Sequence, residues 1–134
     1  MTTASIPLTA TRRTPLLRLA LKLDAIVTGA NGAAYLIAAG PLGDLFGLSP
    51  ALLRGTGAFL VAFAAAVWLT ATRPAIPRAA VYAIVAANAV WAAGSIVAAV
   101  AGWGTPETVG TVWIVLQAIV VAGFAELQLT GLRR

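Results

Sequence analysis

Four polar side chains recur along one otherwise apolar segment, residues 23–37 (LDAIVTGANGAAYLI). Asp24, Thr28, Asn31 and Tyr35 are spaced by four, three and four residues, so they share one face of a helix. A carboxylate, a hydroxyl, an amide and a phenol in one stripe could bind a substrate or conduct an ion. The same groups could instead serve only to join helices, because hydrogen bonds between helices are common in membrane bundles.

Two later segments, 77–101 and 106–130, carry polar and aromatic side chains at helical spacing. On one predicted face of each segment lie, in chain order, Asn88, Trp91 and Ser95, and then Trp113, Gln117, Phe124 and Gln128. At about 1.5 Å per residue, Asn31, Asn88 and Gln117 fall near the middle of a bilayer. We therefore expect three amides from three helices to meet at one level. The candidate intramembrane polar cluster comprises Asp24, Thr28, Asn31, Tyr35, Asn88, Trp91, Ser95, Trp113 and Gln117.

Asp24 is expected to lie closer to the membrane edge, roughly 7 Å inside the hydrocarbon. We expect Arg18, Lys22 or the connection near residue 75 to reach it, since long basic side chains extend toward the interface. An acidic group inside a membrane is a functional candidate by default. A purely structural role for Asp24 is the alternative.

The composition favours a membrane protein. Of the 134 residues, 60% are hydrophobic and only 10% are charged, whereas a soluble domain carries about 25% charged residues. The formal net charge of +5 does not indicate a nucleic-acid partner, because the basic residues flank apolar runs and form no patch between aromatic residues. The lipid bilayer is the expected partner.

The chain contains no Cys and no His, which excludes disulfides and makes bound iron–sulfur clusters or haem unexpected. Its four acidic residues are scattered, and zinc sites use Cys, His and clustered acids. We expect no metal and no cofactor. Because no pair of nucleophile and base can be assembled, we also expect that the protein is not an enzyme.

Four segments are long and apolar enough to cross the hydrocarbon core, which takes about 20 residues. They are residues 16–39, 50–72, 77–101 and 106–130. The sequence predicts an all-α membrane protein, a four-transmembrane-helix antiparallel bundle in which short connections join neighbours. Residues 1–15 are expected to be a disordered basic cytoplasmic N-terminus, and residues 16–131 the transmembrane domain.

The helix boundaries carry recognisable signals. Ser49-Pro50 and Thr105-Pro106 each place a capping hydroxyl before a proline at the first helical position, and Pro77 is expected at that position without a hydroxyl. Gly131 is expected just after the last helix. The longest connection, residues 40–49, is expected to rest at the membrane interface.

The basic residues predict the orientation. Eight lie on one side of the predicted spans, and Arg54 alone lies on the other; the eight are Arg12, Arg13, Arg18, Lys22, Arg73, Arg78, Arg133 and Arg134. Because Lys and Arg are enriched in cytoplasmic flanks, both termini should lie in the cytoplasm, in a multi-pass protein of the plasma membrane. Residues 11–17 (TRRTPLL) resemble a twin-arginine export signal, but charges interrupt the apolar stretch that follows, and we expect this stretch to be a span.

An internal repeat is an alternative within the same fold class. AIVTGAN at residues 25–31 resembles AIVAAN at residues 83–88, with one residue deleted. If the repeat is real, the helices form two tandem hairpins related by an axis along the membrane normal. Alanine-rich helices also resemble one another by chance, so both explanations remain.

Two classes of function fit these observations. The first is a structural, accessory or self-associating membrane subunit, with a second copy or a larger membrane protein as partner. The second is a small gradient-driven transporter or channel that uses the intramembrane polar cluster. A transporter would have to use gradients, since the chain has no nucleotide-binding motif.

Overall fold

A computed structural model describes residues 8–103 and 107–133, which form five α-helices and their connections, without a strand in these ranges. The helices are α1 (Leu8–Ile37), α2 (Ala39–Phe46), α3 (Pro50–Ala71), α4 (Arg78–Ala101) and α5 (Thr108–Arg133). The all-helical class agrees with the sequence prediction.

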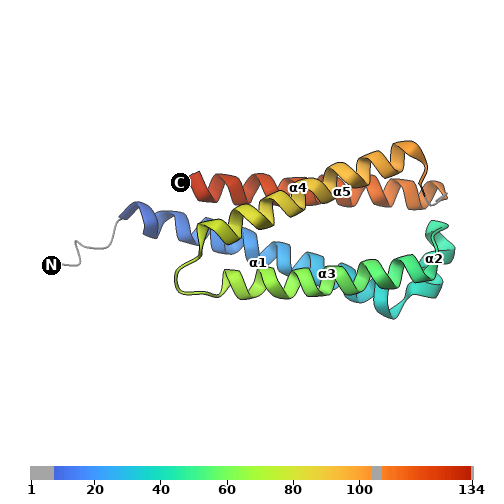
Figure 1. The fold of residues 1–134 in the computed structure, drawn as a ribbon, viewed down its shortest axis with the longest axis horizontal. Helices are drawn as coiled ribbons and strands as arrows, with labels where there is room; N and C mark the ends of the chain where they lie inside the picture. The colour runs from blue at the N-terminus through green and yellow to red at the C-terminus, as the bar shows by residue number, and fades with distance from the viewer. Residues whose placement is uncertain (1–7, 104–106, 134) are drawn as a thin grey trace.

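The four long helices lie along the long axis of the molecule as two pairs (Figure 1). α1 packs along α3, and α4 packs along α5. The pairs are joined mainly through α1 and α5, whereas α3 and α4 barely touch although they are consecutive in the chain. This pairing is the one that two tandem hairpins would give.

Three helices, α3, α4 and α5, are each long and apolar enough to cross a membrane. A fourth span is present if residues Pro15–Ile37 of α1 and the short α2 are counted together as one bent element. Large apolar side chains cover the outside: Ile37 is 86% exposed and Val100 is 84% exposed. Because patches of this kind are rare on monomeric soluble proteins, the helices suggest a membrane protein.

The first helix differs from its prediction at both ends. α1 begins at Leu8 rather than Leu16, and residues 9–14 contain helix-forming Ala and Arg and no glycine. Of the predicted disordered N-terminus, residues 1–7 lie outside the described residues, whereas residues 8–15 belong to α1. At the other end, α1 stops at Ile37 and α2 leaves at 96°.

The bend follows from Pro41. A proline inside a continuing helix would lose a backbone hydrogen bond and clash with the carbonyl four residues earlier. A break at Ala38 instead places Pro41 in the first turn of α2, where no donor is required. Most of the predicted interfacial connection is therefore helix. α2 ends at Phe46 and is capped by Gly47, whose φ of 71° suits glycine.

The remaining boundaries agree with prediction to within a few residues. The Ser49 hydroxyl accepts a hydrogen bond from the Leu52 amide at 3.1 Å, which confirms the predicted cap of α3. Pro77 occupies the cap position itself, one residue before α4 begins. The predicted cap at Thr105-Pro106 lies outside the described residues.

Gly131 does not end the last helix, contrary to prediction. α5 continues to Arg133, and Gly131 is buried against α1. A Cβ atom at this position would lie 2.9 Å from the Leu17 Cα atom. The glycine is explained by this close approach of two backbones and not by helix termination.

α1 and α3 also cross at glycines. A Cβ on Gly32 would lie 2.8 Å from the Gly57 carbonyl oxygen, and a Cβ on Gly57 would lie 2.7 Å from the Gly32 carbonyl oxygen. Small residues allow helix backbones to approach closely in membranes, where van der Waals packing drives association. These two glycines therefore set the closest contact within the first pair.

Two apolar clusters fill the ends of the molecule. The cluster near the termini comprises Leu17, Leu21, Ala25, Val67, Ala71, Val81, Ile84, Val85, Ala125 and Leu132. The cluster near α2 comprises Tyr35, Ala39, Phe46, Leu53 and Leu60. A group of buried polar side chains lies beside the first cluster, and the four long helices line a cavity next to it.

Candidate functional site

Asp24 is fully buried, with 0% of its side chain exposed. Its Oδ1 atom accepts a hydrogen bond from the Thr28 hydroxyl at 2.9 Å. Its Oδ2 atom accepts two more, from the Asn88 amide at 2.8 Å and from the Gln128 amide at 2.7 Å. The Asn88 amide also donates to the Gln128 carbonyl oxygen at 3.2 Å.

These four residues form what we call the Asp24 cluster. They come from α1, α4 and α5, so the cluster joins the first helix pair to the second. An unpaired polar group in hydrocarbon costs several kcal/mol, and here the carboxylate receives three donors. All three donors are uncharged side chains of the same chain. The arrangement is suited to holding helices together.

The prediction that a basic side chain contacts Asp24 is wrong. Arg18 donates to carbonyl oxygens at the end of α3, those of Ala71, Arg73 at 2.8 Å and Pro74 at 3.3 Å. Lys22 lies over the ring of Trp68, 5.5 Å from its centre. The reason is helical phase: residues two or six positions from Asp24 lie on other faces of α1.

A second basic residue behaves as Arg18 does. Arg78 donates to the Leu132 carbonyl oxygen at 3.1 Å, near the end of α5. Cations are favourable at helix C-termini, where the last carbonyls lack partners. Arg18 and Arg78 thus donate hydrogen bonds to carbonyl oxygens at the C-terminal ends of α3 and α5. The carboxylate of Asp24 accepts its hydrogen bonds from uncharged side chains instead.

A cavity of about 1090 Å³ lies beside the cluster. All four long helices line it, and its walls are mostly apolar, with aromatic rings from Phe59, Phe63 and Phe124. Its polar lining comprises Thr28, Asn31, Asn88, Ser95 and Gln117, together with the Trp91 and Trp113 rings. No charged side chain lines this cavity.

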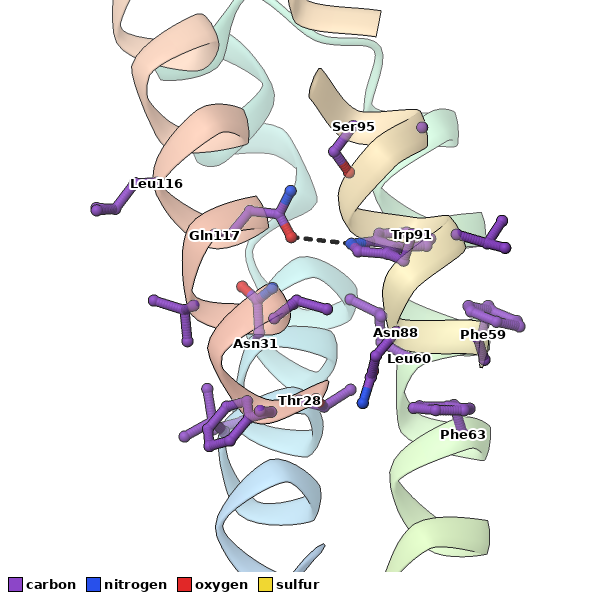
Figure 2. Close-up of a pocket in the computed structure, with 18 of the residues that line it drawn as sticks. Thr28, Asn31, Phe59, Leu60, Phe63, Asn88, Trp91, Ser95, Leu116 and Gln117 are labelled. Atoms are coloured by element: carbon purple, nitrogen blue, oxygen red, sulfur yellow. Dashed lines mark hydrogen bonds between the residues drawn. The ribbon is translucent and has the colours of Figure 1, made fainter. Parts of the chain in front are cut away.

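Figure 2 shows the Asn31 and Gln117 amides in the same space, with Trp91 and Ser95 on the facing helix. The Trp91 indole donates to the Gln117 carbonyl oxygen at 2.9 Å, and the Gln117 amide donates to the Ile114 carbonyl at 2.8 Å. The three amides predicted to meet do line one cavity. They form no hydrogen bonds with one another, because Asn88 turns to the Asp24 cluster instead.

Tyr35 and Trp113 form a separate pair at the α2 end. The Trp113 indole donates to the Tyr35 hydroxyl at 2.6 Å, and its ring stacks on Phe46 with centres 5.8 Å apart. The predicted stripe on α1 is therefore divided among three environments. Asp24 and Thr28 lie in the cluster, Asn31 in the cavity, and Tyr35 in the aromatic pair.

Gln128 is a central member of the cluster that was absent from the candidate set. It is fully buried. The available signal was its spacing, eleven residues after Gln117, which puts both on one face of α5.

Over the part of the chain that the structure describes, the fold and the site define an all-helical structure with three to four apolar spans and a buried polar centre. Comparisons of the chain with protein-family models, with curated proteins and with solved structures find no match. The functional argument therefore rests on the residues and their geometry.

Proposed function

We propose that the chain is a small multi-pass protein of the plasma membrane that serves as a structural, accessory or self-associating subunit. In this proposal it forms a four-helix antiparallel bundle across the bilayer, with α1 and α2 together as the bent first span. Both termini lie on the cytoplasmic side. The bundle carries no catalytic site.

The observation that carries the proposal is the enclosure of Asp24. A carboxylate that moves protons or cations must exchange with water at some stage. Asp24 has no exposed surface and accepts hydrogen bonds from three neutral side chains. Such a group is already satisfied within its own chain, which is what a structural role requires.

The basic residues support the proposed orientation. Arg18 and Arg78 lie at the end of the molecule where the α3–α4 connection and the C-terminus are found (Figure 1). Arg54 lies near the start of α3, at the end where α2 lies. Asp24 is six residues beyond Arg18, about 9 Å deeper along the helix. This asymmetry fits a cytoplasmic location of the first end.

A small gradient-driven transporter or channel is the second candidate, and one observation favours it. Thr28 and Asn88 both bond to Asp24 and line the large cavity. A rearrangement of these two side chains would connect the carboxylate with the cavity. The site of a transporter would then be Asp24 with the amides around it.

Crosslinking in native membranes followed by pull-down tests the proposed role. The proposal predicts a stoichiometric complex, either with a larger membrane protein or with a second copy of the chain. A monomer that crosslinks to nothing would contradict it. So would a purified sample that turned over a substrate and lost this turnover in the Asp24→Asn variant.

A further inference from the structure

The large cavity contains an amide without a partner. Asn31 is half-buried and lines the cavity, and its side chain makes no hydrogen bond within residues 8–103 and 107–133. The neighbouring Gln117 already accepts from Trp91 and donates to a backbone carbonyl. An unpaired amide among apolar walls is costly. A bound molecule with a hydrogen-bonding atom at this position would remove that cost.

The lining determines the charge of such a molecule. Every residue around the cavity is uncharged, so an ionic group would lose its hydration and gain no counter-charge. The walls are aliphatic and aromatic, and two further polar side chains reach the cavity on either side of the Trp91–Gln117 hydrogen bond, Ser95 above it and Asn31 below it in Figure 2. The fitting ligand is neutral, mostly apolar, and carries one or a few hydrogen-bonding atoms.

The volume suits a small molecule. Small-molecule sites measure about 300–1,000 Å³, and this cavity measures about 1090 Å³.

The cavity opens on the apolar flank of the molecule. Ile26, Phe59 and Val90 line it and are 56%, 52% and 71% exposed. Phe59 also stacks on Trp91, with ring centres 5.8 Å apart, across the gap between α3 and α4. Since this flank would face hydrocarbon, a ligand would reach the cavity from within the bilayer.

We propose that the cavity is a binding site for a neutral, lipid-soluble molecule with a hydroxyl or carbonyl group, which hydrogen-bonds to Asn31. The cavity shares Thr28 and Asn88 with the Asp24 cluster, but the ligand contact proposed here is to Asn31, and it does not depend on whether the protein has a partner subunit. Its aromatic walls hold the apolar part of the ligand.

Tryptophan fluorescence in phosphatidylcholine vesicles tests the site with a brominated probe. The probe is 9,10-dibromooctadecan-1-ol, and the reference is 9,10-dibromooctadecane, which lacks a polar group. Bromine quenches tryptophan on contact, and Trp91 and Trp113 line the cavity. We expect quenching by the alcohol to saturate above a linear background, and quenching by the alkane to remain linear.

Two variants test where the probe binds. Asn31→Leu should raise the half-saturating mole fraction of the alcohol about tenfold, the equivalent of one lost hydrogen bond of about 1.4 kcal/mol. Gly94→Leu should abolish saturation, because Gly94 lines the cavity and has open space around its Cβ position. Gly123→Leu is the matched control: it also has open space but lies outside the lining, so saturation should persist. Circular dichroism verifies that each variant folds.

Equal linear quenching by the alcohol and the alkane, in the native chain and in Gly94→Leu alike, would overturn the proposal. The gap would then be filled only by bulk lipid chains. The variant Gly94→Cys, which introduces a single thiol into a chain without Cys, provides a second check. Efficient crosslinking of this cysteine to a second chain would assign the cavity to a partner helix and would also overturn the proposal.

Discussion

At the scale of single residues, the chemistry of this molecule depends on the hydrogen bonds that one buried carboxylate accepts. Asp24 receives two amide donors from other helices and one hydroxyl donor from its own helix. Helical spacing predicted which groups share a face, and the stripe on α1 does turn inward at Asp24, Thr28 and Tyr35. Spacing could not predict which amide pairs with Asp24, because that depends on how far the helices slide and rotate against one another.

Replacement of Asp24 by leucine should lower the free energy of unfolding by about 2–4 kcal/mol, since each buried donor left without an acceptor costs about 1–3 kcal/mol. The Gln128 amide would lose its hydrogen bond to Asp24, and the Asn88 amide would keep only the longer bond to the Gln128 carbonyl oxygen. Reversible unfolding in mixed micelles measures the change. An effect no larger than that of a surface substitution such as Val100→Ala would contradict the structural role of the cluster.

Gln128 offers an independent test of the same cluster. Gln128→Leu removes the link to α5 and should destabilise the protein by about 1–3 kcal/mol. Leu127→Gln is the control, because it places an amide on the same turn of α5 but on an exposed face. This change should leave the Asp24 cluster intact. Equal unfolding midpoints for Gln128→Leu and the native chain would show that the cluster contributes nothing.

At the scale of helices, glycines and prolines explain where the elements end and how closely they approach. The sequence signal of a capping hydroxyl followed by a proline predicted the start of α3 correctly. The sequence does not predict the bend at Ala38, because Gly40-Pro41 is typical both of the end of a helix and of the first turn of another one. The role of Gly131 was missed because a glycine near a helix end carries the same sequence signal whether it terminates the helix or contacts another one.

Substitutions at two glycines on α3 distinguish the effect of close packing on stability from the effect of helix propensity. Gly57→Ala should destabilise the protein by about 1–3 kcal/mol, as overpacking does, because its new methyl group would meet the α1 backbone. Gly55→Ala, two residues earlier and facing open space, should stabilise it by about 0.5–1 kcal/mol through helix propensity. Thermal unfolding of the two variants side by side measures both effects. The same sign for both changes would contradict the close crossing of α1 and α3.

At the scale of the whole molecule, two helix pairs meet along α1 and α5 and leave a cavity between them. Composition and apolar lengths predicted the helical membrane class. The cavity itself was not predictable, since it results from the weak contact between α3 and α4, and hydrophobicity patterns do not report how helices are spaced.

The topology can be tested on the intact chain. Reporter fusions at Gly43 and Gly104 should report the external side, and a fusion at Ala75 should report the cytoplasm. The physical reason is the excess of basic residues at the end of the molecule that carries the α3–α4 connection. An external signal at Ala75 would contradict the proposed orientation.

Proton and cation flux through purified protein in sealed vesicles tests the central claim, that the Asp24 cluster is structural. The native chain and Asp24→Asn, which keeps the shape of the side chain and removes its charge, are measured side by side under an imposed pH or potassium gradient. The account predicts a flux no greater than that of empty vesicles for both proteins, and an Asp24→Asn variant that folds with equal or greater stability. A flux carried by the native chain and abolished in a folded Asp24→Asn variant would contradict it.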